Sequence, residues 1–81
     1  MALDILTPDK KIYSGEVVSV QVPGTSGSFE ILKNHAAIIS TLEKGKVKIK
    51  SKTGIETFMI NGGVIEVLKN KITLLAEGIS N

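Results

Sequence analysis

The stretch KVKIKSKTG, residues 46–54, has the most regular residue pattern in the chain. Its lysines alternate with Val47 and Ile49, so the charged and the apolar side chains point to opposite faces of an extended strand. Thr53-Gly54 follows, at the place where a hairpin turn is expected. One face of this strand is therefore expected to be buried. The other face carries a lysine row, which consists of Lys46, Lys48, Lys50 and Lys52.

The lysine row has two interpretations. A row of lysines is most often a solvated face, and lysines on an edge strand keep that strand from pairing with another chain. The alternative is that the row attracts an acidic partner or lipid headgroups. The sequence favours the first interpretation, a solvated face that can also protect an edge.

Short segments with similar patterns occur along the whole chain. Val18, Val20 and Val22 are expected to share one face of a strand. Strands are expected at 2–7, 11–13, 16–22, 29–32, 37–42, 46–52, 55–61, 64–68 and 71–77. Eight to ten short strands, with turns every 6 to 12 residues, predict an all-β fold. We expect a two-sheet β-sandwich or flattened barrel that forms a single domain over residues 1–81.

Composition narrows the function classes. The chain has 81 residues, a net charge of +2 and no arginine. It also has no cysteine, so neither disulfides nor thiolate metal sites can form. The lack of arginine and the presence of only three aromatic residues argue against nucleic-acid binding. No apolar run reaches the roughly 20 residues that a membrane-spanning helix needs. No secretory signal is present at the N-terminus, so we expect a soluble protein made in the cytoplasm.

His35 is the only histidine, and it follows a glycine-containing loop. A Ser-His-Asp site would have to combine His35 with a serine and with Asp4 or Asp9, but nothing in the sequence brings them together. The acidic residues are scattered singly, so no metal site is predicted. We expect no catalysis, no cofactor and no small-molecule substrate. A small hydrolase would instead require a concave pocket that holds His35 and a carboxylate.

A lipoyl- or biotinyl-type carrier domain is the alternative function. Such domains are also all-β, are of similar length, and present a lysine at a hairpin tip. Lys52, Lys69 and Lys71 lie near predicted turns. The residues that flank the modified lysine in carrier domains are missing here, as are the two quasi-symmetric halves. An intact mass that includes the adduct would identify a carrier.

Four segments carry a resemblance to a known family: LTPDKKIYSGE at 6–16, PGTSGSFEILKNHAAII at 23–39, GGVIEV at 62–67 and NKITLLAE at 70–77. In register over essentially the whole chain, they resemble the N-terminal β-sandwich domain of the epsilon subunit of F-type ATP synthase. The chain departs from the family pattern at Glu30, where the family has Gly, and at Lys33-Asn34, where it has Pro-Gly. Asn also adopts positive φ at modest cost, so the turn before His35 is expected to persist.

The resemblance implies a non-catalytic rotor subunit in the central stalk. It would bind the gamma subunit and the ring of c subunits, and help couple proton-driven rotation to ATP synthesis. The expected location is peripheral, on the cytoplasmic side of the bacterial inner (plasma) membrane. Longer members continue as a C-terminal helical hairpin that inhibits hydrolysis or binds ATP. The sequence stops at Asn81, so we expect a short form without that hairpin.

The resemblance also implies which residues make contacts. Strands 57–60 and 64–68 are apolar on both faces. This pattern indicates a partner surface, cover by loops or strand crossings, or apolar residues that lie singly on the surface. Contact with the c ring is expected from Gly24, Thr25, Ser26, Gly27, Ser28 and Phe29. Contact with gamma, or with the junction between gamma and the ring, is expected from His35, Ala36, Ile38, Ser40 and Lys46.

Overall fold

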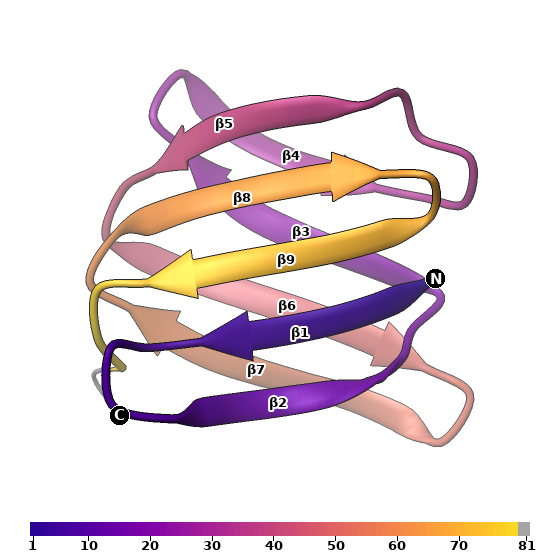
Figure 1. The fold of residues 1–81 in the computed structure, drawn as a ribbon, viewed down its shortest axis with the longest axis horizontal. Coiled ribbons are helices and arrows are strands. Elements are labelled where there is room, and N and C mark those ends of the chain that lie inside the picture. The colour runs from indigo at the N-terminus through magenta and orange to yellow at the C-terminus, as the bar shows by residue number, and fades with distance from the viewer. Residues whose placement is uncertain (80–81) are drawn as a thin grey trace.

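Residues 1–79 are described by a computed structural model, in which they form strands and turns (Figure 1). These residues contain no helix, and hence no helix that could cross a membrane. The strands are β1 (Ala2–Leu6), β2 (Lys11–Glu16), β3 (Ser19–Gly24), β4 (Gly27–Ile31), β5 (Ile38–Leu42), β6 (Gly45–Ser51), β7 (Gly54–Ile60), β8 (Gly63–Leu68) and β9 (Lys71–Ala76).

The nine strands form one sheet that folds over on itself into two layers. The hydrogen-bonded order is β2-β1-β9-β8-β5-β3-β6-β7, and β4 pairs with β3. In Figure 1 the layer β5-β8-β9-β1-β2 lies in front and the layer β4-β3-β6-β7 lies behind. The layers join where β5 meets β3, at a single register pair between Leu42 and Gly24. The predicted all-β sandwich is therefore confirmed.

The core fills the space between the two layers. Alternate residues of each strand point inward, because successive side chains of a strand face opposite sides. Val47 and Ile49 are buried, as the pattern at 46–54 predicts. The buried hydrophobic residues are Leu3, Ile5, Val17, Val20, Val22, Ile31, Leu42, Val47, Ile49, Ile60, Ile65, Val67, Ile72, Leu74 and Ala76.

Two strand boundaries differ from the prediction by three residues, and the others by two or fewer. The strand expected at 11–13 extends to Glu16, because Ser14 and Gly15 continue the pairing with β1. The strand expected from residue 16 begins only at Ser19. Val17 takes the inward position before it, and Val18 is 49% exposed, so the prediction that Val18 shares a face with Val20 was wrong.

The position of β6 contradicts one interpretation of the lysine row. β6 lies between β3 and β7, and pairs with both of them. It is thus an interior strand of its layer, and its lysines do not protect a sheet edge. Lys46, Lys48 and Lys50 point outward as predicted, and Lys52 lies in the turn between β6 and β7.

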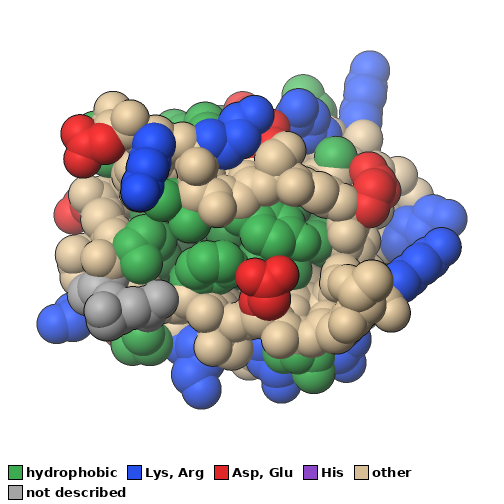
Figure 2. Space-filling model, turned by 90° about the horizontal axis from the view of Figure 1, so that it is seen from below, with side chains coloured by type: hydrophobic (Ala, Val, Ile, Leu, Met, Phe, Trp, Pro, Cys, Tyr) green, Lys and Arg blue, Asp and Glu red, His purple; other side chains and the backbone are tan. Residues whose placement is uncertain are grey.

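An open seam separates the two ends of the sheet, β2 and β7. The rings of Tyr13 and Phe58 meet there in an edge-to-face contact, with their centroids 6.2 Å apart. Figure 2 views the molecule from below, the side on which both strands lie in Figure 1, and shows hydrophobic side chains gathered in a central hollow. The fold is therefore a sandwich that is open along one side.

Candidate functional site

The first predicted contact segment forms a tight hairpin tip between β3 and β4. Gly24 and Gly27 pair across a turn made by Thr25 and Ser26, and Gly27 has φ +126°. The tip is also fastened to β5, because the Thr25 amide donates to the Thr41 carbonyl at 3.2 Å. Their hydroxyls lie 3.0 Å apart. Thr25, Ser26, Gly27 and Ser28 are exposed, so this tip is a firmly held and accessible surface.

Phe29 and Gly24 have a different position from the rest of the tip. Gly24 is buried, and Phe29 is half-buried and packs against the core. A Cβ on Gly24 would lie 2.6 Å from the Gly27 carbonyl oxygen and 2.8 Å from the Phe29 ring. These two residues therefore shape the tip, while its exposed surface comes from residues 25–28.

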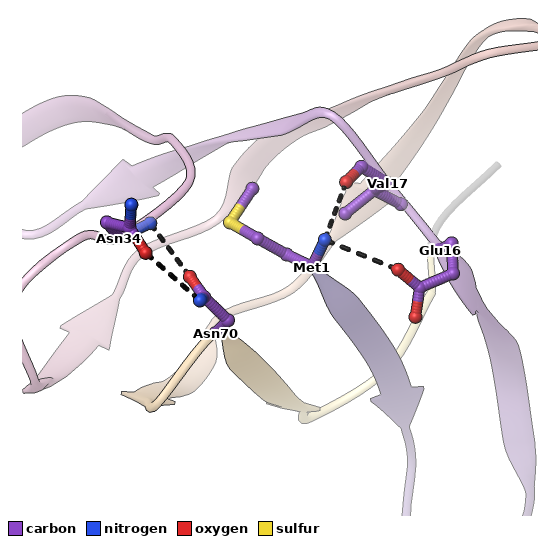
Figure 3. Close-up of polar contacts among 5 residues, drawn as sticks. All are labelled: Met1, Glu16, Val17, Asn34 and Asn70. Atoms are coloured by element: carbon purple, nitrogen blue, oxygen red, sulfur yellow. Dashed lines mark hydrogen bonds and ion pairs between the residues drawn. The ribbon is translucent and has the colours of Figure 1, made fainter.

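The second predicted segment begins in the loop between β4 and β5. Asn34 has φ +65°, so it takes the left-handed conformation that the family's glycine would adopt. Figure 3 shows Asn34 facing Asn70, which lies in the turn between β8 and β9. The Asn34 amide donates to Asn70 Oδ1 at 2.7 Å, and Asn70 Nδ2 donates to Asn34 Oδ1 at 3.1 Å. This asparagine pair holds the loop to the opposing turn.

His35 follows Asn34 and makes two hydrogen bonds with its own loop. Its amide donates to the Leu32 carbonyl at 3.1 Å, and its ring Nδ1 lies 2.8 Å from the Ala36 carbonyl oxygen. Both partners are main-chain groups, so no carboxylate or serine is brought to the ring. The described residues also contain no group of three or more His, Cys, Asp or Glu side chains that could hold a metal.

The other residues predicted to contact gamma do not lie on one surface. Ile38 and Ser40 pair with Val67 and Ile65, which point inward, and Ile38 packs against the core. Ile39 between them points outward and is 74% exposed. Ala36 is exposed in the loop. Side chains alternate between the two faces of β5, so Ile39 is the apolar residue of this strand that is exposed for contact. Ile39 was not among the contact residues predicted from the sequence.

Lys46 is separated from His35 by the whole of β5. His35 precedes this strand and Lys46 follows it, next to the hairpin tip, where a Cβ on Gly45 would lie 2.8 Å from the Pro23 side chain. Figure 1 shows the β4–β5 loop and the β3–β4 tip at opposite ends of the molecule. The structure thus brings Lys46 to the tip and not to His35.

An outer apolar face lies on the front layer and consists of Ile39, Val64, Leu68 and Leu75. Val64 pairs with Leu75 on the neighbouring strand, whereas Ile39 lies directly opposite Glu66, which points outward between Val64 and Leu68 and pairs with Thr73. The exposed fractions of the four side chains range from 36% to 74%. Shallow hollows of about 370 and 360 Å³ flank them, the second lined by Leu6 and Pro8. The two-faced pattern at 64–68 therefore marks two small exposed apolar clusters, Val64 with Leu75 and Ile39 with Leu68, with the Glu66 carboxylate between them.

Asp4 lies beside the outer apolar face, and its neighbours lower the pKa of its carboxyl group. The Ser14 hydroxyl donates to Asp4 Oδ1 at 2.7 Å, and Lys71 Nζ lies 3.6 Å from Oδ2. The Ser14 hydrogen bond, followed by the positive charges of Lys11 and Lys71, holds the pKa of Asp4 below its ordinary value of 3.8. Asp4 is therefore charged at neutral pH, which places a polar border next to the apolar patch.

These features define a small all-β sandwich domain with a clamped hairpin tip and an exposed apolar sheet face. The family described as "ATP synthase, Delta/Epsilon chain, beta-sandwich domain" matches residues 1–81. The chain therefore belongs to this family, which confirms the resemblance seen in its sequence.

Relatives of this chain include ATP synthase epsilon chains of several bacteria. The chain is 47% identical to that of Chlorobium limicola over 79 residues, which span 96% of this chain and 90% of the relative. It is 43% identical to that of Sulfurimonas denitrificans over 79 residues, but spans only 61% of that longer chain. The match over nearly the whole of the Chlorobium protein supports an epsilon-subunit role.

Solved structures share the fold at lower sequence identity. A chain of the Euglena gracilis mitochondrial ATP synthase structure gives a TM-score of 0.89 at 17% identity, covering 96% of this chain and 51% of that one. A chain of the Tetrahymena thermophila mitochondrial ATP synthase central stalk and c-ring structure gives 0.85 at 18% identity. It covers 99% of this chain and 65% of that one. These likenesses support the sandwich architecture.

The carrier-domain alternative loses its basis. Lys52 and Lys69 do lie in hairpin turns, as such a domain would require. The whole-length family match is to a different class of protein, however. We therefore set the carrier function aside.

Proposed function

We propose that this chain is a rotor subunit of an F-type ATP synthase, which binds gamma and the c ring and helps couple rotation to ATP synthesis. The observation that carries the proposal is the outer apolar face on a chain of this family. Exposed apolar side chains that gather on one face of a small domain indicate a contact surface, and here the Glu66 carboxylate lies among them as a polar group. A permanent interface is apolar because it resembles a core cut in half.

The hairpin tip supplies the proposed contact with the c ring. Residues 25–28 are exposed, and Thr41 of β5 anchors the turn, so the tip keeps its shape under load. Gly24 and Phe29 contribute by packing beneath it. A rigid tip suits a mechanical contact, because packed protein interiors are barely compressible and transmit strain.

The outer apolar face and the His35 loop supply the proposed contact with gamma. Ile39 and Leu75 are well exposed on this face. The loop that carries His35 and Ala36 lies at the end of β5 opposite the hairpin tip. Ile38 and Ser40 support the face from its inner side. Ring and gamma are thus bound by different parts of one stiff body.

The subunit itself is proposed to be non-catalytic. Its one histidine is bonded to main-chain groups, and its relatives are named for a subunit of a multi-subunit complex. The proposed location is peripheral, on the cytoplasmic side of the membrane that holds the ring. Residues 1–79 form one sandwich, and the proposed roles belong to that sandwich.

Binding to purified gamma from the same organism tests the proposal. Ile39→Glu and Leu75→Glu place a charge on the outer apolar face at side chains that are already at least half exposed, so the fold should persist. We expect each to weaken binding by about 30-fold or more, since central interface residues contribute about 2 kcal/mol or more. Calorimetric titration measures the change.

Ile55→Glu is the matched control for these variants. Ile55 is 57% exposed and also lies on a strand, but on the outer side of the other layer. Its substitution should leave the dissociation constant within about threefold of the original, as expected for a side chain outside the interface. If Ile39→Glu and Leu75→Glu bind gamma as tightly as Ile55→Glu does, the assigned face is wrong.

A further inference from the structure

The back layer of the sandwich presents an uncompensated line of positive charge. Lys46, Lys48 and Lys50 point outward from β6, and the residues between them, Val47 and Ile49, are buried. Successive lysines on one face of a strand lie about 7 Å apart. The three side chains therefore form a straight row, and Lys52 continues the charge into the adjoining turn.

The residues that face these lysines across the sheet are uncharged. Lys48 pairs with Gln21 on β3 and with Thr57 on β7. Lys50 pairs with Ser19 and Ile55, and Lys46 with Met59. Cross-strand neighbours of opposite charge would have stabilised such a row, and they are missing here.

The two ion pairs found within residues 1–79 do not include a lysine of the row. They join Glu16 to the Met1 ammonium and Asp4 to Lys71, both outside the back layer's lysines. Glu30 pairs with Gln21, which pairs with Lys48, so this carboxylate lies on the same face and lines a shallow hollow with Lys48 and Lys50. It is not part of either ion pair. The row therefore keeps a net positive charge that an acidic partner could meet.

We propose that the lysine row binds an acidic, extended segment of a partner protein. Carboxylates on alternate residues of an extended chain repeat at the same spacing of about 7 Å, so each can meet one lysine. Because β6 is an interior strand, edge protection does not account for the row. The row lies on the layer opposite the outer apolar face, so it adds a contact beyond those proposed for gamma and the ring.

Two other polyanions fit this face less well. A bilayer presents charge over a plane and favours lysines spread in two dimensions, whereas these lie in a line. Nucleic acid is read with arginine forks and stacking aromatic side chains. The chain has no arginine, and Phe29, Phe58 and Tyr13 all pack against the core.

A titration with a short acidic peptide tests the proposal. The probe is an eight-residue peptide of alternating Glu and Thr, added to isotope-labelled protein while backbone amide shifts are recorded at low and physiological salt. We expect the shifts to concentrate on β6 and its neighbours β3 and β7. A peptide with its four Glu residues in one block should bind at least threefold more weakly, because its carboxylates do not match the row.

Matched triple variants separate the row from net charge. Lys46→Gln, Lys48→Gln and Lys50→Gln together should weaken peptide binding at least tenfold, since an exposed pair contributes up to about fivefold each. Lys10→Gln, Lys33→Gln and Lys69→Gln remove the same charge from exposed sites elsewhere, and should weaken it by less than threefold.

Equal losses in the two triple variants would overturn the proposal, because binding would then follow net charge alone. Row-dependent binding to vesicles with 30% anionic lipid that is tighter than binding to the peptide would also overturn it, in favour of a lipid surface. Neither result bears on gamma binding through Ile39, so failure here is distinguishable from failure of the rotor assignment.

Discussion

At the residue scale, Asn34 replaces a glycine and does more than a glycine could. It adopts φ +65°, and its side chain accepts a hydrogen bond from Asn70, which itself has φ +61°. Asn is among the few residues that tolerate this conformation. The substitution thus preserves the turn before His35 and adds a tie to the β8–β9 turn.

Substitutions at Asn34 separate backbone conformation from the side-chain bond. Asn34→Ala should lower the free energy of unfolding by about 2 kcal/mol, because it adds left-handed strain and removes a hydrogen bond. Asn34→Gly removes only the bond and should cost about 1 kcal/mol. Urea unfolding measures both. Equal costs for Ala and Gly would show that strain at this position is unimportant.

Asp4 gives a pH-dependent prediction. Its folded-state pKa is lowered, so its contribution to stability is fully present above the ordinary value of 3.8 and is lost as the pH falls through the folded value. Ser14→Ala removes the largest cause, and should raise the Asp4 pKa towards 3.8. Carboxyl chemical shifts followed through an acid titration measure this value. An unchanged pKa would mean that the Lys11 and Lys71 charges dominate.

At the element scale, the sheet depends on a glycine where β8 begins. Gly63 has φ +156°, and a Cβ there would collide with the backbone of β9 at the Leu75 carbonyl and the Ala76 Cα. Gly54, where β7 begins, has a similar φ of +145°, but a Cβ there would meet nothing within 4 Å. Two glycines with a similar φ therefore differ in the space that a side chain would find beside them.

Alanine substitutions at these glycines should differ in cost. Gly54→Ala should destabilise the protein by about 1–3 kcal/mol through backbone strain alone. Gly63→Ala should cost more, because the opposing backbone of β9 must also move. Thermal or urea unfolding ranks the two variants. If Gly54→Ala is as costly as Gly63→Ala, the close approach of β9 contributes nothing.

Alternation in sequence predicted the number of strands and most of their faces. It placed Val47 and Ile49 in the core correctly, because period-two patterns report directly on side-chain direction. It failed at Val17 and Val18, where the chain shifts by one residue before β3. A one-residue shift exchanges the two faces, and no local sequence feature marks it.

These local sequence patterns could not predict the order of the strands in the sheet. The interior position of β6 depends on pairing with β3, more than twenty residues earlier in the chain. Pairings of this kind decided that Lys46 lies near the tip and that Ile39, rather than Ile38, faces outward. The family resemblance predicted the contact segments, and the strand register shows which side chains within them are exposed.

At the scale of the whole molecule, the sandwich separates its surfaces. The hairpin tip lies at one end, the outer apolar face on the front layer and the lysine row on the back layer. One stiff core joins them, so a force applied at the tip reaches the other surfaces with little deformation. This arrangement suits a part that links a rotating ring to a shaft.

Weakening the core should weaken every surface together. Ile72 is fully buried in β9, and Ile72→Ala should cost about 2–5 kcal/mol through lost packing and the cavity left behind. A small domain has little stability to spare, so gamma binding should then fall with the folded fraction. Circular dichroism and calorimetry on the same samples compare the two. Weak binding by a fully folded Ile72→Ala protein would contradict this coupling.

Co-elution with a purified subcomplex of gamma and the c ring from the same organism tests the rotor assignment most directly. The protein should elute with the subcomplex in size-exclusion chromatography at one copy per gamma, and Ile39→Glu should abolish co-elution while Ile55→Glu should not. Elution of the unmodified chain as a free monomer, with folded gamma and intact ring present, would contradict the assignment.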